Sequence, residues 1–267
     1  MPPIVIGHLR LPSGELAGAL LQCVLERLGH RVELVQAPAR DLLARMGAGE
    51  IHLVSSAALQ LAGPEWNRLR HDAVEVAALS EGHRFLWSIP DSPALRGVRT
   101  IADLARAPVR REVAAVEGGP AAHQSRAALQ AYGLDAAGFR IREETMAHWR
   151  GLCRQAGADP DGFVIAHPSH HLLPEECEFR ALADPLRALG GEFRTASVAR
   201  AAVAGSLPPR TREVLRRVFT GAADLTEMEA QMRRMQAAPR ALARAWLDAN
   251  TRVSSSWLAE APASQPR

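Results

Sequence analysis

The chain has 267 residues, 47% of them hydrophobic and 23% charged, which is typical of globular proteins and long enough for two lobes or two small domains. The net charge is only +3 and every basic residue is arginine, which excludes Schiff-base lysines and the lysine of a phosphate-binding loop. The arginines are interleaved with acidic residues and form no basic run, so we expect no nucleic-acid partner.

The cysteine spacing and the first residues of the chain exclude further classes of protein. Cys23, Cys153 and Cys177 are widely spaced and include no CxxC pair, so we expect neither a disulfide framework nor a cysteine zinc site. No apolar run approaches the roughly 20 residues that a membrane helix needs. The first residues, MPPIVIGHLRLPSG, carry neither a basic leader nor an apolar signal core. As written, the chain is expected to stay in the cytoplasm unless an upstream signal is missing.

Strand and helix patterns alternate along the chain from its first residues. Apolar segments bounded by turn residues predict strands at 4–6, 31–35, 51–54, 73–79, 84–89, 112–116, 139–141, 163–166, 178–182 and 194–199. Helical spacing predicts helices from an N-cap at Ser13 to Gly29, at 39–46, after a cap at Thr100, at 120–131, at 144–156 and repeatedly from 209 onward. Repeated strand–helix units predict parallel α/β layers.

Two α/β series joined by a short crossing segment near residues 83–100 predict two lobes that share a hinge. Two lobes of this kind enclose a cleft, and clefts hold ligands. In the helical C-terminal part, Met228, Met232 and Met235 have helical spacing and are expected to pack in a core, as is Cys23 near the N-terminus.

Several sequence segments of the chain resemble those of one known family, the glycine betaine/choline-type substrate-binding proteins of ABC importers. Residues 4–57 resemble the N-terminal lobe of that family. The resemblance continues in RTIADL, VEGGPAAHQSRAALQAYGLD, GFVIAHPSHHLL and MEAQMRRMQAAPRALARAWLDANTRVSSSWL, which follow the family's order over nearly the whole chain.

The resemblance implies a two-lobed α/β fold of the periplasmic-binding-protein (Venus flytrap) type, with a mixed sheet flanked by helices in each lobe and a helical C-terminal segment. One lobe would be discontinuous, residues 1–86 plus 194–267, and the other would be 87–193. The implied role is to bind a small polar solute without a cofactor and deliver it to an ABC permease, as a monomer in the periplasm or cell envelope.

The chain departs from the family where the family surrounds a quaternary ammonium with Trp and Tyr faces. The loop after the first strand reads His8-Leu9-Arg10-Leu11-Pro12, and the loop after the third strand reads Ser55-Ser56-Ala57-Ala58. A Trp-containing turn of the family is replaced by residues 167–171, HPSHH. We therefore expect a ligand that differs from a standard betaine, such as a solute rich in carboxylate or hydroxyl groups.

The histidine cluster follows a buried-type strand, where α/β proteins place loops that contact ligands. The interpretations that remain open are recognition of a polar or anionic ligand, a metal site, and surface histidines in a polar turn. The residues concerned are His167, Ser169, His170 and His171, with His8 from the other lobe as a further ligand-binding candidate. The metal alternative uses His167, His170 and His171.

The other candidates also lie after strands. The amides of Gly118 and Gly119 at the start of a helix could bind a carboxylate, although Gly-Gly-Pro also makes a plain tight turn. Arg10 could clamp a carboxylate or could face solvent. Ser13, Ser55 and Ser56 could bond a polar group or could serve as loop and cap residues.

No catalytic motif is present, since GxSxG, HExxH, GxGxxG and a Cys beside a His at motif spacing are all missing. We therefore predict a binding protein with no catalytic residues. The alternatives are a cytoplasmic ligand-sensing domain of the same fold and a metal-binding protein that uses the histidine cluster.

Overall fold

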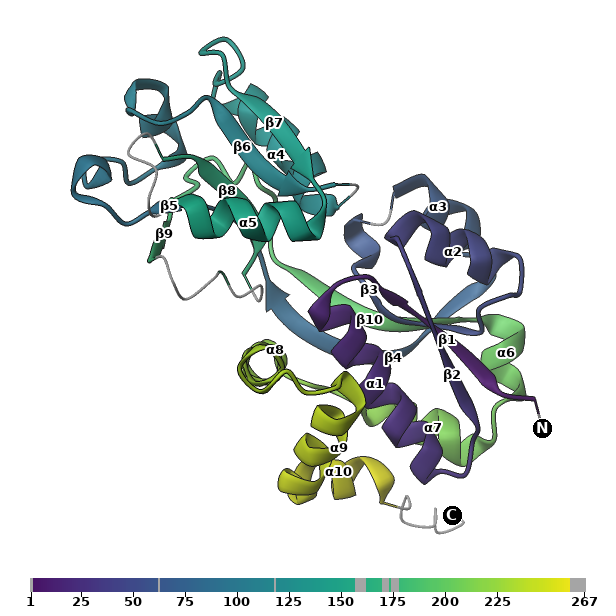
Figure 1. Cartoon of the computed structure of the whole chain (residues 1–267). Coiled ribbons are helices and arrows are strands. Elements are labelled where there is room, and N and C mark those ends of the chain that lie inside the picture. The colour runs from purple at the N-terminus through teal and green to yellow at the C-terminus, as the bar shows by residue number, and fades with distance from the viewer. Residues whose placement is uncertain are drawn as a thin grey trace, which may run out of the picture. The chain divides into compact units, whose positions relative to one another are not determined.

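A computed structural model describes residues 2–61, 63–117, 119–156, 162–169, 173 and 178–259. The chain divides into two compact units (Figure 1). Unit 1 comprises Met1–Glu81 and Arg194–Arg267, and unit 2 comprises Gly82–Phe193. None of the described helices is long and apolar enough to cross a membrane.

Unit 1 is built on a five-stranded mixed sheet with the order β2-β1-β3-β10-β4. The strands are β1 Ile4–Leu9, β2 Val32–Ala37, β3 Leu53–Ala57, β4 Ala73–His83 and β10 Phe193–Arg200. Strands β2 and β3 pair in parallel with β1, whereas β10 runs antiparallel to β3. The N-terminal part of this sheet thus has the parallel α/β arrangement that the sequence predicts.

Helices cover the sheet of unit 1 and form its C-terminal part (Figure 1). They are α1 Pro12–Arg27, α2 Ala39–Gly47, α3 Gly63–Leu69, α6 Ala201–Ser206, α7 Pro209–Arg217, α8 Ala222–Met235, α9 Pro239–Ala249 and α10 Thr251–Leu258, with a short 3₁₀ turn at Leu59–Leu61. Helices α8 and α9 pack against α1.

Helix α1 begins two residues earlier than predicted. Leu11 is its N-cap and Pro12 occupies the first helical position, so the prediction that Ser13 caps the helix is wrong. Proline favours this position because its fixed φ suits a helix and it has no N–H to leave unpaired. Gly29 follows the helix with φ +85°, and its amide bonds the Glu26 carbonyl. The predicted glycine end of this helix is confirmed.

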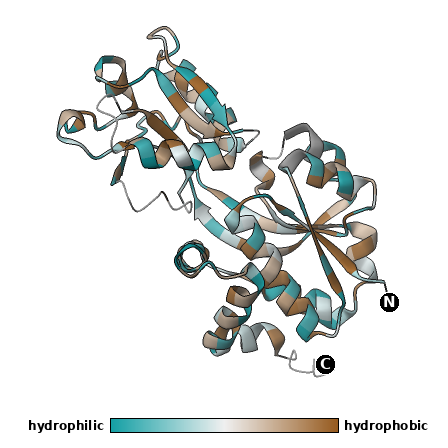
Figure 2. Cartoon of the chain, in the orientation of Figure 1, coloured by the Kyte–Doolittle hydropathy of each residue, from teal (hydrophilic) through white to brown (hydrophobic). Residues whose placement is uncertain are grey.

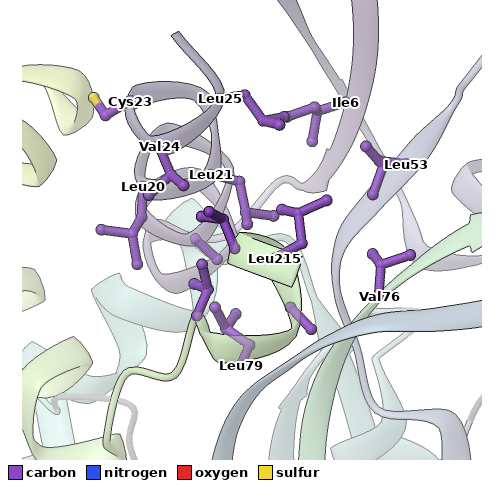
Figure 3. Close-up of a cluster of buried hydrophobic side chains, with 14 of the residues drawn as sticks. Ile6, Leu20, Leu21, Cys23, Val24, Leu25, Leu53, Val76, Leu79 and Leu215 are labelled. Carbon is purple, nitrogen blue, oxygen red and sulfur yellow. The ribbon is translucent and has the colours of Figure 1, made fainter. Parts of the chain in front are cut away.

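The apolar face of α1 packs on the sheet and on α7. Figure 3 shows Leu20, Leu21 and Val24 of α1 gathered with side chains from the strands and with Leu215. Burial of one such leucine stabilises the fold by about 1.5–3 kcal/mol. Cys23 is 4% exposed, which confirms it as a core residue.

The methionine prediction holds only in part. Met228 is buried and Met232 packs partly buried in a cluster between α1, α8 and α9, whereas Met235 is 68% exposed. Met235 is the last residue of α8, and Gln236 after it turns into the left-handed conformation. The helical stripe therefore ends one turn earlier than the spacing of the three methionines suggests.

Unit 2 holds a second five-stranded mixed sheet with the order β7-β6-β8-β5-β9. The strands are β5 Phe85–Pro90, β6 Glu112–Val116, β7 Arg140–Glu144, β8 Val164–Pro168 and β9 Phe179–Ala181. Strands β7 and β8 are parallel to β6, and β5 is antiparallel to β8. The helices are α4 Pro120–Ala131 and α5 Met146–Ala156, with 3₁₀ turns at Pro93–Leu95 and Ile101–Arg106.

Local sequence accounts for several of these elements. Thr100 caps the turn at Ile101–Arg106 through a reciprocal box with Asp103, as predicted, although the turn is a 3₁₀ helix.

Figure 2 shows hydrophobic residues concentrated on the inner strands of each sheet, while the helices alternate between hydrophobic and hydrophilic sides. This is the pattern of a sheet covered by amphipathic helices.

Two short helices were not predicted. Helix α3 begins at a Gly-Pro pair that reads as a turn, and α6 is a six-residue segment without a polar face. The first strand was predicted to end at Gly7, but β1 continues to Leu9 because its pairing with β2 continues to Ala37. Tertiary pairing therefore overrides the local turn preference of this glycine.

Candidate ligand-binding site

In unit 1, two candidate residues lie on the neighbouring parallel strands β1 and β3. His8 is the residue before the end of β1, and Ser55 is the middle residue of β3, so the prediction that Ser55, Ser56 and Ala57 form a loop after the third strand is wrong. Gly7 pairs with Val54, so the next residues, His8 and Ser55, follow at the same level of the sheet. Ligands of open α/β sheets bind outside the carboxyl ends of the strands. The structure therefore places together two residues that the sequence predicted separately.

His8 is 7% exposed and lies against helix α1. A Cβ atom built on Gly18 would come within 3.2 Å of the His8 Cβ atom, so the absence of a side chain at Gly18 makes room for the histidine. Nδ1 of His8 lies 3.0 Å from the Leu9 carbonyl oxygen. That oxygen can only accept, so Nδ1 donates.

Replacement of Gly18 by alanine is expected to destabilise the protein by about 1–2 kcal/mol, because β1 is held between two strands and His8 cannot move away. Gly151 in α5 is the matched control, since nothing lies within 4 Å of a Cβ added there. Gly151→Ala is expected to stabilise by about 0.5–1 kcal/mol. Urea unfolding of both variants checks the prediction, and equal shifts of the same sign would contradict it.

Ser55 is completely buried, and Ser56 beside it is half-buried. The backbone oxygen of Ser55 accepts a hydrogen bond from Ser197 Oγ at 2.6 Å. The Ser55 hydroxyl itself has no hydrogen-bond partner among the described residues. Leaving a buried hydroxyl unpaired costs about 1–3 kcal/mol, and a ligand contact by Ser55 or Ser56 stays a prediction.

Arg10 and Ser13 flank the start of α1. Arg10 is exposed, Ser13 is half-buried, and neither side chain makes a hydrogen bond or ion pair with the described residues. Helix α1 has no side-chain cap at its N-terminus, so its first amides are also open. A ligand contact by Arg10 or Ser13 stays a prediction.

In unit 2, Gly119 is the N-cap of α4 and follows the carboxyl end of β6. Its amide bonds the Val116 carbonyl oxygen at 3.2 Å, which makes the tight turn that Gly-Gly-Pro favours. No side chain caps α4 and its first turn has no acidic residue, so its N-terminus also remains suited to an anion. Gly118 lies outside the described residues.

His167, near the end of β8, is only 5% exposed and is bonded at both ring nitrogens. Nδ1 lies 3.0 Å from the Pro168 carbonyl oxygen and therefore donates, and Nε2 lies 2.9 Å from Ser88 Oγ and accepts from it. Burial lowers the pKa of His167 to about 4, so the ring is neutral at neutral pH. Its bonds are satisfied inside unit 2, and a ligand contact by this ring stays a prediction.

Ser169 is exposed and closes the turn after β8, because its hydroxyl accepts a hydrogen bond from the Arg84 amide at 3.0 Å. His170 and His171 lie outside the described residues. Within the described part of the chain, no group of three His, Cys, Asp or Glu side chains could hold a metal ion. The metal alternative is therefore not tested.

The sequence did not identify two residues that hydrogen-bond to candidate site residues, Ser88 and Ser197. Each lies inside an apolar strand and bonds a candidate residue or its backbone. A polar residue within an otherwise apolar strand is the feature that could have identified them, since a buried hydroxyl needs a partner.

Comparison with known proteins assigns the chain to a family. A model of the substrate-binding domain of ABC-type glycine betaine transport systems (OpuAC) matches residues 2–249. No curated protein matches the chain in sequence.

Solved structures share the fold over almost the whole chain. Lactococcal OpuAC complexed with glycine betaine is 15% identical, with a TM-score of 0.84 over 97% of this chain and 100% of that one. ProX from Borrelia burgdorferi, a glycine betaine/L-proline-binding protein, is 14% identical, with a TM-score of 0.82 over 97% of each chain. A choline-binding protein in complex with choline is 14% identical, with a TM-score of 0.81 over 96% of this chain and 91% of that one.

These likenesses confirm the two-lobed α/β fold of periplasmic binding proteins that the sequence predicted. The identities are too low to carry ligand specificity to this chain. The family match rests on nearly the full length of the sequence. The chain belongs to the family of substrate-binding domains of ABC-type glycine betaine transport systems.

Proposed function

We propose that this protein is the substrate-binding component of an ABC importer, and that its two units are the lobes that hold a small polar solute for delivery to the permease. The observation that carries the proposal is the position of polar groups at the carboxyl ends of strands in each sheet. In unit 1 these groups are His8 and Ser56, each the residue before the last of its strand, and in unit 2 they are Gly119 and Ser169. Family membership supplies the transport context.

The ligand is bound without chemical change. Ser88 and His167 have the hydroxyl–imidazole distance of a nucleophile and its base, 2.9 Å, but both are buried. The pKa of His167, about 4, also makes this ring a poor base at neutral pH. The pair is better explained as an internal bond that holds β5 against β8, and the family is one of binding proteins.

A ligand screen by thermal unfolding tests the proposal. A compound present at 100 times its Kd stabilises the protein by about 2.7 kcal/mol, which raises Tm by roughly 5–10 °C for a chain of this size. The panel covers betaines, choline, carnitine, amino acids, small carboxylates, polyols and divalent metals. We expect at least one organic solute to raise Tm by this amount.

Two results would contradict the proposal. One is the absence of a shift with every organic solute, and the other is conversion of a bound solute into a product, which mass spectrometry of the recovered ligand would detect. A shift with a metal alone would instead support the histidine-cluster alternative.

A further inference from the structure

Arg187, in the loop that follows β9 in unit 2, has an unusual backbone conformation. Its φ is +52°, and Gln236 is the only other described residue besides glycines with a positive φ. This left-handed region is unfavourable for a residue that has a Cβ atom, and the chain places glycine at similar positions such as Gly133 and Gly190. Strained backbone of this kind concentrates at functional sites, so an arginine kept here suggests a function for its side chain.

Hydrogen bonds within unit 2 hold this loop in place. The Asp184 carboxylate accepts two backbone amides of the loop and the hydroxyl hydrogen of Tyr132. The Tyr132 hydroxyl in turn accepts the Leu186 amide at 3.0 Å. The same bonds that hold Arg187 in its conformation therefore keep Leu186 at the surface, where 60% of it is exposed.

A second exposed arginine lies beside the loop. Thr100 pairs with Ala183 in a short parallel bridge, and the Arg99 carbonyl oxygen accepts the Ala183 amide at 2.9 Å. The side chains of Arg99 and Arg187 are both exposed, and neither makes a hydrogen bond or ion pair with the described residues. Leu186, Arg187 and Arg99 thus lie on adjoining segments and form the Arg99–Arg187 surface.

The carboxylates near this surface are engaged by other groups. Asp184 and Asp103 accept hydrogen bonds from the segments that they stabilise, and Asp91 pairs with Arg180 at 3.2 Å. Arg96, in the same segment as Asp91 and Asp103, is exposed as well. Elsewhere on the protein, arginines form ion pairs with Asp or Glu side chains. The guanidinium groups of the Arg99–Arg187 surface therefore keep their N–H donors open to a carboxylate from outside the chain.

We propose that the Arg99–Arg187 surface binds the ABC permease, through an acidic segment of that partner that supplies carboxylates to the two arginines and an apolar contact to Leu186. The inference rests on the proposed function, because delivery of a solute requires contact with a permease. Arginine bonds carboxylates with two parallel hydrogen bonds and is enriched at protein interfaces. A loop that is already held in place loses little entropy when a partner binds it.

The same observations favour a protein over an anionic membrane as the partner. Recognition of anionic lipids relies on clusters of about four to eight basic residues or on an amphipathic helix. This surface has fewer basic groups, on segments that hydrogen bonds fix in one arrangement. Such an arrangement suits the defined positions of carboxylates on a protein.

Binding to membrane vesicles tests the inference with the intact protein. Right-side-out vesicles are prepared from the organism that encodes the chain, in a strain that lacks this gene, and are compared with protein-free liposomes of the same extracted lipids. We expect binding to the vesicles that weakens as the salt concentration rises, and at least tenfold weaker binding to the liposomes. Equal binding to vesicles and liposomes, or no binding to either, would overturn the inference.

Charge reversal compares this surface with other exposed arginines. The double variant Arg99→Glu/Arg187→Glu is expected to weaken vesicle binding at least tenfold. Arg140→Glu/Arg252→Glu is the matched control, because Arg140 and Arg252 are also exposed and make no side-chain hydrogen bond or ion pair with the described residues. Its net charge is the same, and we expect its binding to equal that of the wild type. An equal effect of the two double variants, or none, would overturn the inference.

Arg187→Gly gives a result that a purely structural role would not produce. Glycine tolerates the left-handed conformation, so the midpoint of urea unfolding is expected to rise. Loss of the guanidinium is expected to weaken vesicle binding about threefold or more. A lower midpoint with unchanged binding would show that Arg187 serves the fold alone and would overturn its role.

A photo-crosslinking residue in place of Leu186 identifies the partner. Irradiation of the vesicle-bound protein is expected to join it to the transmembrane subunit of an ABC importer, which mass spectrometry identifies. Attachment to a lipid, or to a protein that belongs to no importer, would overturn the inference. The proposed function is judged separately by the rise in Tm that a solute produces, which all these variants should retain, so a failed docking test leaves that function standing.

Discussion

Replacement of Trp87 by alanine is expected to destabilise unit 2 by about 3–5 kcal/mol. Trp87 is fully buried in β5, between β8 and β9, and its removal would leave a cavity in the middle of the sheet. The change would also leave Ser125, itself fully buried, without the indole N–H that its hydroxyl accepts at 2.8 Å. The cavity and the unpaired hydroxyl act in the same direction.

Urea unfolding followed by far-ultraviolet circular dichroism, with hydrogen exchange of peptides from unit 2, measures this effect. Trp87→Phe keeps most of the ring volume but loses the N–H, so it is expected to cost about 1–3 kcal/mol. Phe219→Ala is the control, because Phe219 is 41% exposed and its loss should change stability by less than about 0.5 kcal/mol. A Trp87→Ala protein as stable as this control would show that β5 is not part of the core.

Acidification from pH 6.5 to about pH 4 is expected to remove about 3 kcal/mol of stability through His167 alone. Burial lowers the pKa of this ring from the ordinary 6.5 to about 4 in the folded protein. Between these two pH values the unfolded chain binds a proton that the folded protein does not, so stability rises with pH across this window. The contribution of His167 is complete above pH 6.5 and is lost as the pH falls toward 4.

His167→Gln should reduce this dependence, because glutamine has no proton to gain. The free energy of unfolding of both proteins at pH 4.5 and pH 7 measures the difference, and an NMR titration of the His167 ring locates its pKa directly. Burial also lowers the pKa of His83, so some dependence of the same sign will remain in the variant. An unchanged loss of stability in His167→Gln would contradict the prediction.

The sequence identifies some candidate residues of the site by their position after a predicted strand, but it does not identify their hydrogen-bond partners. The sequence predicted His8 and Ser55 because each follows an apolar strand, and the parallel pairing of β1 with β3 brings them to one level. Whether a buried polar group finds a hydrogen-bond partner depends on residues from distant parts of the chain. The partner of the Ser55 carbonyl is Ser197, 142 residues away, and no local pattern encodes that distance.

His167 was expected to be exposed, but the structure buries it. As one of three histidines in a polar turn it suggested an exposed ligand or metal site, yet β8 extends to Pro168 and pairs with β5, which carries the ring into the interior beside Ser88. The alternation of strand residues and the position of a neighbouring strand decide burial. Both arise from pairing between segments about 80 residues apart.

The amino-acid sequence by itself determined the α/β class, most strands and helices, the glycine end of α1, the cap at Thr100 and the family. These features depend on local periodicity, on capping chemistry and on the order of short segments, all of which can be read along the chain. Only the tertiary structure decided that Leu11 and not Ser13 is the N-cap of α1, that Met235 is exposed and that His167 is buried inside unit 2. It also decided that the Ser55 hydroxyl is buried without a hydrogen-bond partner among the described residues. Burial and hydrogen-bond satisfaction depend on which distant segments pack together, so they are set by the assembled sheets.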